Sequence, residues 1–256
     1  MIDLNTIDEL KCLVRELGKE VESLKQKIIT ADKKKDGSPV TIADEYINKY
    51  LLQFLSSTKY KNIISEEHKL QTFSLRKGWD YYWVIDPIDG TKEYLNKSTD
   101  YTINVALCRN DSPIFGLVYA PALEDLYISI KNEGSYKNDN KIESKKQFDS
   151  KINVVASLSH LNPQTKHFIK LLKAKYEINL VQAGSSLKIC LVAEGKADIY
   201  PRFGPTMEWD TCAAHSILTE AGGFLLDQES NDLRYNKEDP HNPFFYAVGS
   251  KQFILK

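Results

Sequence analysis

The sequence predicts a protein that combines α+β and α/β structure, with an N-terminal α+β half over residues 1–150 and a C-terminal α/β half over residues 151–256. Helical apolar stripes at the start of the chain are followed by short apolar runs that glycine and proline separate, which is typical of antiparallel strands. The second half alternates strand-like and helix-like segments instead, which indicates α/β structure. Residues 141–151 are charged and weakly patterned, so we place the junction between the halves there.

Two helices are predicted before residue 60. Apolar residues three and four apart run from Ile7 to Ile28, and Thr6-x-x-Glu9 has the form of a capping box at a helix start. About three heptads is the lower limit for a coiled coil, so we expect this helix to pack on the protein's own core. A second helix is predicted to begin after Thr41. Its expected buried face consists of Ile42, Tyr46, Ile47, Tyr50, Leu51, Phe54 and Leu55.

A short strand is predicted at Asn62–Ser65, and two carboxylates follow it, Glu66 and Glu67. Neighbouring side chains on an extended segment point to opposite sides, so at most one of the two lies squarely in a single-sided site. The next residues, His68–Asp80, are polar and irregular, and we interpret them as a mobile loop.

The most informative stretch is Trp83–Tyr94, which reads W-V-I-D-P-I-D-G-T-K-E-Y. Its apolar start predicts a buried strand that ends near Pro87, because proline lacks an N–H group and cannot continue a central strand. Gly90 allows the backbone to approach a ligand closely, and a helix opening after it would point its first N–H groups at an anion. Asp86 and Asp89 would repel that anion unless cations lay between them. Carboxylate oxygens of this kind suit Mg²⁺.

The remaining elements follow from short patterns. Antiparallel strands are predicted at Tyr101–Cys108, Pro113–Tyr119 and Asp125–Ile130, with a further strand near residues 134–138. In the second half, strands are predicted at residues 152–156, 180–183, 197–200, 224–226 and 244–248. Helices are predicted to begin at Asn162-Pro163, where asparagine caps and proline occupies the first turn, at Gly184 and at Glu208.

Composition narrows the class of protein. With 256 residues, 42% of them hydrophobic, the chain can bury a large core. Its 34 basic and 35 acidic side chains almost cancel, so no overall field favours nucleic-acid polymers or anionic membranes, and an anionic substrate needs a local site. The 4 cysteines form no C-x-x-C pair, which favours a reducing compartment. No apolar run approaches the roughly 20 residues of a membrane span. We expect a cytoplasmic protein, and peripheral attachment at the inner membrane face stays open.

The string D-P-I-D-G-T at Asp86–Thr91 resembles the signature of the inositol monophosphatase superfamily of Mg²⁺-dependent, lithium-sensitive phosphatases. Its extension K-E-Y, together with G-S-S-L-K at Gly184–Lys188, is similar to the CysQ-type 3'(2'),5'-bisphosphate nucleotidases. The resemblance implies a layered α-β-α-β-α sandwich. It also implies two or three Mg²⁺ ions and a water that removes the 3'-phosphate of adenosine 3',5'-bisphosphate, or of its 5'-phosphosulfate analogue, without a covalent phosphoenzyme. The partner would be this small molecule, and the resemblance leaves monomer and homodimer open.

The resemblance also implies a role for individual residues. The metal ligands would be Glu66, Asp86, the carbonyl oxygen of Ile88, Asp89 and Asp210, with Glu67 as a neighbour of the ligands. Asp44 would accept a hydrogen bond from Thr91, and this pair would orient and deprotonate the attacking water. Substrate contacts would come from Gly90, Thr91, His160, Ser185, Lys188 and Arg202. From the spacing alone, Ser185 and Lys188 share one face at a helix N-terminus.

Simpler interpretations exist for several of these residues. Asp44 and Asp210 fall in the first turns of predicted helices, where a carboxylate stabilises the helix dipole whatever its chemistry. Two other functions are also compatible with the motifs: an inositol or fructose-bisphosphate phosphatase, and a phosphonucleotide sensor without turnover. The G-S-S-L-K segment followed by P-R-F-G-P favours a bisphosphorylated nucleotide, and the intact Asp44/Thr91 pair with the full set of ligands argues against a sensor.

Overall fold

The computed structural model describes residues 2–26, 31–33, 39–156 and 162–251. Its helices are α1 (Leu4–Gln26), α2 (Ile42–Ser57), α3 (Phe73–Arg76), α4 (Thr91–Leu95), α5 (Pro163–Lys173), α6 (Leu187–Ala193) and α7 (Glu208–Glu220), with a 3₁₀ turn at Pro121–Leu123. Its strands are β1 (Ala31–Lys33), β2 (Pro39–Thr41), β3 (Ile63–Ser65), β4 (Tyr81–Asp89), β5 (Thr102–Arg109), β6 (Ser112–Ala120), β7 (Asp125–Ile130), β8 (Gly134–Lys137), β9 (Asn140–Ile142), β10 (Lys151–Ala156), β11 (Glu177–Gln182), β12 (Ile199–Arg202), β13 (Phe224–Asp227) and β14 (Phe245–Val248).

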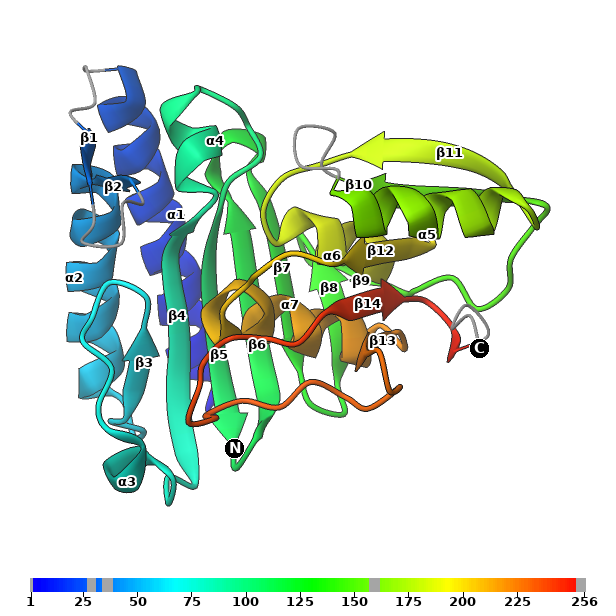
Figure 1. Ribbon diagram of the computed structural model, residues 1–256. Coiled ribbons are helices and arrows are strands. Elements are labelled where there is room, and N and C mark those ends of the chain that lie inside the picture. Colours follow the sequence, from blue (N-terminus) through cyan, green and yellow to red (C-terminus); the bar gives the residue numbers. More distant parts are fainter. Residues whose placement is uncertain (1, 27–30, 34–38, 157–161, 252–256) are drawn as a thin grey trace.

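In the described residues, the elements stack as layers of the order α-β-α-β-α (Figure 1). Helices α1 and α2 bury their apolar sides against one face of the larger sheet. Helices α6 and α7 fill the space between the two sheets, and α5 covers the outer face of the smaller sheet. The central strands of each sheet are therefore buried on both faces, whereas the edge strands β9 and β11 are largely exposed. The predicted layered sandwich is confirmed.

The two sheets differ in the direction of their strands. The larger sheet has the order β3-β4-β5-β6-β7-β8-β9 and is antiparallel except for the parallel pair β3–β4. The smaller sheet has the order β11-β10-β12-β14-β13, in which β10 is parallel to both of its neighbours. The antiparallel run β5–β7 and the alternating second half thus appear as predicted. The division into halves near residue 150 stays a prediction.

Helix α1 forms for the predicted reason but begins earlier. Leu10, Val14 and Val21 are fully buried, which confirms that the apolar stripe faces the core. The helix starts at Leu4, and the Asp3 carboxylate accepts a hydrogen bond from the backbone N–H of Thr6 at 2.9 Å. Asp3 is therefore the capping residue, and the predicted capping box at Thr6 is wrong. Ile28 lies outside the described residues.

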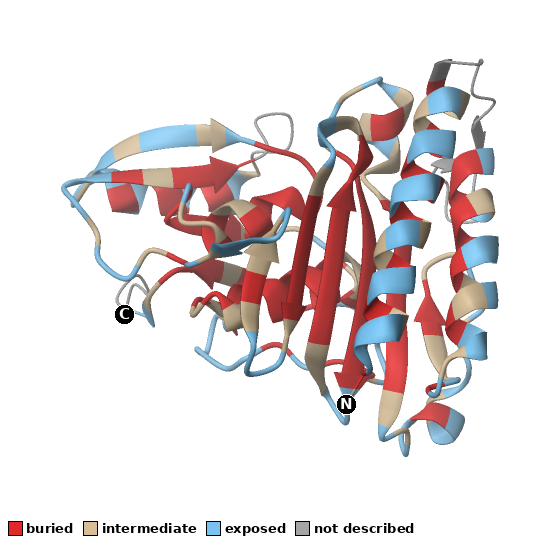
Figure 2. Ribbon diagram, turned by 180° about the vertical axis from the view of Figure 1, so that it is seen from behind, coloured by how far each residue is buried: buried red, intermediate tan, exposed pale blue. Residues whose placement is uncertain are grey.

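The buried face of α2 is narrower than its apolar pattern suggests. Ile47, Leu51 and Leu55 are fully buried, as predicted. Ile42 and Tyr50, however, are 63% and 37% exposed, so their assignment to the buried face is wrong. The helix contacts the core along one stripe only, and Figure 2 shows the outer faces of the two N-terminal helices turned to solvent.

Strand β4 continues through Pro87, contrary to the prediction that the strand ends there. The reason is the pairing around it. Strand β3 pairs with β4 only over Trp83–Ile85, and the register between β4 and β5 shifts between Asp86 and Asp89. The missing N–H of Pro87 therefore falls where the ladder is already interrupted, at the end of the sheet that carries the acidic residues.

The predicted irregular loop at residues 68–80 contains a short helix, α3, and a buried cation. Arg76 is 1% exposed, and its guanidinium donates to the Asn236 side chain at 2.7 Å and to the Glu238 carbonyl oxygen at 3.1 Å. Asn236 donates back to the Arg76 carbonyl oxygen at 2.7 Å. The loop assignment is wrong for this segment, because distant partners that no local pattern reveals hold it to the C-terminal half.

Candidate active site

Three carboxylates from separate elements converge at one end of the larger sheet. Asp86 lies in β4, Glu66 follows β3 directly, and Asp210 lies in the first turn of α7. The parallel pairing of β3 with β4 brings the first two together, since the backbone N–H of Glu66 donates to the Ile85 carbonyl oxygen at 3.2 Å. One oxygen from each of the three carboxylates lies within 4.8 Å of the others.

This cluster is unfavourable when its acids are all ionised. Burial, and then the charges of Glu66, Asp89 and Asp210, raise the pKa of Asp86 well above its ordinary value. Burial and the charge of Asp89 raise the pKa of Asp210 to about 8. Neither carboxylate oxygen of Asp86 accepts a hydrogen bond from a donor in the described part of the chain. Buried oxygen ligands without donors fit a hard divalent cation such as Mg²⁺.

The other predicted metal ligands lie beside this cluster. Asp89 ends β4 and lines a cavity, where its carboxylate accepts a hydrogen bond from Ser186 at 2.8 Å. Ile88 is buried, and its carbonyl oxygen accepts from the Thr91 hydroxyl at 3.2 Å. Glu67 is half-buried, and its backbone N–H donates to the Ser65 hydroxyl at 3.3 Å. Their roles in metal binding stay predictions.

The predicted pair of Asp44 and Thr91 is close in space. The Thr91 hydroxyl lies 3.4 Å from a carboxylate oxygen of Asp44, whose side chain is 1% exposed. Gly90 precedes Thr91 with φ of 90°, a left-handed conformation that favours glycine. A Cβ atom there would also lie 3.2 Å from the Asp100 carbonyl oxygen. The tight turn therefore requires a glycine and places Thr91 at the start of α4.

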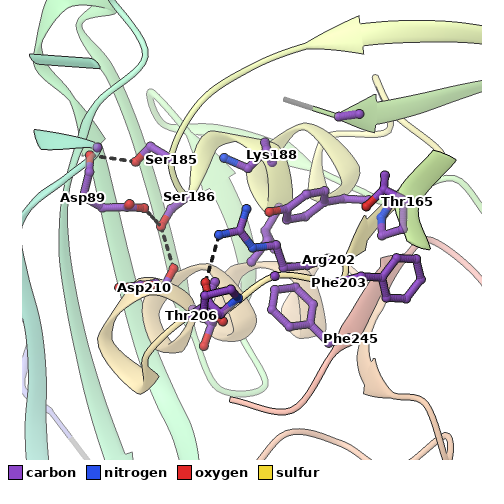
Figure 3. Close-up of a pocket in the computed structure, with 18 of the residues that line it drawn as sticks. Asp89, Thr165, Ser185, Ser186, Lys188, Arg202, Phe203, Thr206, Asp210 and Phe245 are labelled. Atoms are coloured by element: carbon purple, nitrogen blue, oxygen red, sulfur yellow. Dashed lines mark hydrogen bonds between the residues drawn. The ribbon is translucent and has the colours of Figure 1, made fainter. Parts of the chain in front are cut away.

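A cavity of about 670 Å³ opens next to the carboxylates (Figure 3). Its wall contains two of the predicted substrate-binding cations, Lys188 on α6 and Arg202 on β12. Lys188 is 7% exposed, and burial, with the charge of Arg202, lowers its pKa to about 8 against the opposing effect of Asp89. Its ammonium group lies 5.5 Å from the centre of the Tyr200 ring. Arg202 donates to the Pro205 carbonyl oxygen at 3.0 Å.

The predicted position of Ser185 on the first turn of a helix is wrong. It lies before α6, which begins at Leu187, and its φ is 54°, so it does not share a helical face with Lys188 as predicted. The Ser185 hydroxyl donates to the Asp89 carbonyl oxygen at 2.9 Å and is 2.7 Å from the Thr102 hydroxyl. Ser185 still lines the cavity. The predicted substrate contact His160 lies outside the described residues.

Two polar residues at the site were missed by the sequence analysis, Ser186 and Asn104. Ser186 follows Ser185 in G-S-S-L-K, and only the first serine was assigned a role. Asn104 interrupts the apolar strand T-I-N-V-A-L-C, and it is 1% exposed. A buried polar residue in such a run is an informative signal that could have identified it.

Among the described helices, none combines the length and the apolar character needed to cross a membrane.

Comparison with known proteins places this chain in a family. A family model described as the inositol monophosphatase family matches residues 4–249. The chain is 37% identical over 240 residues, 90% of its length and 87% of the relative's, to a protein named 3'(2'),5'-bisphosphate nucleotidase CysQ from Buchnera aphidicola subsp. Acyrthosiphon pisum. A relative of the same name from Escherichia coli strain K12 is 37% identical over 83% of this chain and 86% of its own.

A solved structure agrees with these relatives. The crystal structure of CysQ from Bacteroides thetaiotaomicron, described as a bacterial member of the inositol monophosphatase family, shares 38% identity with a TM-score of 0.81. The match covers 91% of this chain and 93% of that one. The resemblance predicted from the motifs is confirmed: the chain belongs to the inositol monophosphatase family.

Proposed function

We propose that this member of the inositol monophosphatase family is a Mg²⁺-dependent 3'(2'),5'-bisphosphate nucleotidase that converts adenosine 3',5'-bisphosphate to AMP and phosphate. Two relatives that carry the nucleotidase name are each 37% identical to it over more than four fifths of its length, which supports the substrate class. The 5'-phosphosulfate analogue belongs to the same class.

One observation carries the proposal. A single cavity is lined by the carboxylates Asp89 and Asp210 and by the cations Lys188 and Arg202 (Figure 3). A monophosphate ester needs only the carboxylate side of the cavity and the metal ions that it would hold. A second phosphate needs its own positive partners, and charge-assisted hydrogen bonds to phosphate are the strong kind. Tyr200 and Phe203 line the same cavity, so the site also contains aromatic side chains that a nucleoside could contact.

In this proposal the chain's residues divide the chemistry between them. Glu66, Asp86 and Asp210 would hold Mg²⁺ together with Asp89 and the Ile88 carbonyl oxygen. The bound ions would polarise the phosphoryl oxygens and lower the pKa of water. Thr91 would hold the attacking water, and Asp44, next to it, would accept the proton. Lys188 and Arg202 would orient the substrate through its second phosphate.

The proposal extends to cofactor number, partner and location. Two or three Mg²⁺ ions would neutralise the acids, and the partner would be the small phosphorylated nucleotide. A cytoplasmic location is part of the proposal, since all four cysteines, at positions 12, 108, 190 and 212, are free, which suits a reducing compartment.

Phosphate release from a panel of substrates tests the proposal. The panel contains adenosine 3',5'-bisphosphate, its 5'-phosphosulfate analogue, inositol 1-phosphate and fructose 1,6-bisphosphate, each with Mg²⁺ and with excess chelator. We expect the two nucleotides to be hydrolysed with the highest kcat/KM, and all hydrolysis to stop in chelator. A preference for inositol 1-phosphate or fructose 1,6-bisphosphate would overturn the substrate assignment. Binding of nucleotide without phosphate release would indicate a sensor.

A further inference from the structure

We propose that Ser186 and Asn104 are positioning residues that hold the Asp89 carboxylate in the orientation in which it binds a divalent cation. The inference rests on the proposed function, because it takes Asp89 as part of the metal site. It concerns residues that do not contact the substrate's reacting atoms but act through Asp89.

Ser186 bridges two of the acidic residues. Its hydroxyl lies 2.8 Å from a carboxylate oxygen of Asp89 and 2.9 Å from the carbonyl oxygen of Asp210 (Figure 3). The side chain is 2% exposed, so water does not replace these contacts. One hydroxyl therefore ties the end of β4 to the first turn of α7, the two elements whose separation sets the width of the carboxylate cluster.

Asn104 determines how the Ser186 hydroxyl is turned. Its side-chain amide donates to the Ser186 oxygen at 2.8 Å. A hydroxyl has one proton and two acceptor lone pairs, so a donor on the oxygen leaves the proton for an acceptor elsewhere. The two acceptors within reach are the Asp89 carboxylate and the Asp210 carbonyl oxygen, and a carboxylate oxygen is the stronger acceptor of the two kinds. Asn104 thus directs the Ser186 proton toward the metal side of the cluster.

The environment of Asn104 argues against a purely structural role. It lies between Ile103 and Val105 in a strand whose neighbouring side chains are fully buried, and in register it faces Asp86 on β4. Its side-chain oxygen has no hydrogen-bond partner in the described part of the chain. Burying an amide oxygen without a hydrogen-bond donor costs free energy, and an apolar residue of similar shape would avoid that cost. The amide is therefore explained by the hydrogen bond that it does make, to Ser186.

Residues that support metal ligands in this way typically change metal affinity by about 10- to 100-fold when replaced. We therefore expect Ser186→Ala to raise the Kd for Mg²⁺ by about that factor. Asn104→Leu keeps the branched shape and the number of side-chain heavy atoms and suits the apolar strand, and it leaves the Ser186 hydroxyl in place but free to turn. It should raise the Kd by a smaller factor in the same direction.

The measurement is calorimetric titration of Mg²⁺ into the full chain after removal of metal with chelator, accompanied by thermal unfolding of each metal-free variant. The double variant adds a direct test of the proposed order of contacts. If Asn104 acts through Ser186, the Kd of the double variant equals that of Ser186→Ala, because residues in one network are not additive.

Ser216→Ala is the matched control. Ser216 is 2% exposed on α7, and its hydroxyl accepts a hydrogen bond from Ser129 at 2.8 Å, between the larger sheet and the same helix. Among the hydrogen bonds of the described residues, none joins its side chain to one of these carboxylates. The control should lose stability as any buried hydroxyl does, while its Kd for Mg²⁺ stays within about twofold of that of the wild type.

The possible outcomes distinguish failure of the positioning role from failure of the proposed function. An unchanged Kd in Ser186→Ala, or an equal change in Ser216→Ala, overturns the inference. Should Ser186→Ala fail to fold, Asn104→Leu decides, and a wild-type Kd there overturns it as well. A wild-type chain that binds no Mg²⁺ contradicts the proposed function itself.

Discussion

The two sides of the cavity bear opposite charges but share one property. Asp210 lines one side, with Asp86 beside it in the carboxylate cluster, and the pKa values of both are raised because burial and like charges oppose their ionisation. On the other, Lys188 has a lowered pKa because burial opposes its protonation. Each side therefore disfavours its own charge until a ligand of opposite charge arrives. Metal ions would complement the first side and a substrate phosphate the second.

The two sides differ in what supports them. The acids come from β3, β4 and α7, so the carboxylate side depends on contacts between the N-terminal and C-terminal segments of the chain. The cations come from α6 and β12, which are close in sequence. Changes on the carboxylate side should consequently affect catalysis as a whole. Changes on the cationic side should affect the choice of substrate.

The largest effect is expected for Asp86→Asn. Even residues that only support metal ligands change activity by about 10- to 100-fold, so replacing a ligand should lower kcat by more than about 100-fold on every substrate of the panel. The metal-free variant should unfold at a higher temperature than the wild type at pH 8, because asparagine removes a buried carboxyl group whose ionisation burial and neighbouring charges oppose. Phosphate release and thermal unfolding measure the two effects. The control is Asp139→Asn, which replaces an exposed carboxylate. Full Mg²⁺-dependent activity of Asp86→Asn would contradict the claim that the carboxylate side is required for catalysis.

A smaller and more selective loss is expected for Arg202→Ala. Losing one charge-assisted contact to the second phosphate should raise KM for adenosine 3',5'-bisphosphate by about 10- to 100-fold with little change in kcat. Inositol 1-phosphate lacks that phosphate and should be affected much less. Arg234→Ala, which removes an exposed arginine 3.1 Å from Asp111, is the control. Equal losses on both substrates would show that Arg202 does not select the nucleotide.

The carboxylate side also predicts how the stability of the metal-free chain depends on pH. The pKa of Asp210 is about 8 in the folded chain against an ordinary 3.8, so between these values the folded state binds more protons than the unfolded state. The free energy of unfolding should therefore fall as pH rises through this window, by up to about 1.4 kcal/mol per pH unit for one such group. Urea unfolding in chelator at pH 6.5 to 8 measures it, because below pH 6.5 the lowered pKa of buried His215 acts on stability in the opposite direction. Mg²⁺ should remove the decline, and stability that rises with pH in chelator would contradict the prediction.

The cationic side predicts the smallest effect, a change in the pH profile. The pKa of Lys188 is about 8 in the free chain, so its charge is present below that pH and is lost above it. With saturating Mg²⁺, kcat/KM for adenosine 3',5'-bisphosphate should fall by up to about tenfold per pH unit above pH 8. Lys188→Arg keeps its charge and should extend activity to higher pH. An identical alkaline decline in both proteins would exclude Lys188 as its cause.

Local sequence determined much of this molecule. The apolar stripe of α1, the antiparallel run β5–β7 and the asparagine cap of α5 arise from neighbours a few residues apart, and all were predictable. So was the position of the acids, because the D-P-I-D-G-T string places Asp86 and Asp89 on one short segment with a specific family signature. The family, the fold class and the closeness of Asp44 to Thr91 followed from such strings.

Tertiary structure decided the features that depend on residues far apart in the chain. Ser186 contacts Asp89 and Asn104, which precede it by 97 and 82 residues, and Arg76 is buried against Asn236, 160 residues away. The passage of β4 through Pro87 depends on where β3 stops pairing with it. The exposure of Ile42 and Tyr50 depends on which stripe of α2 meets the sheet. Propensity and periodicity describe a residue's neighbours along the chain. The partner of a buried hydrogen-bonding group is set by how whole layers pack, which only the folded structure specifies.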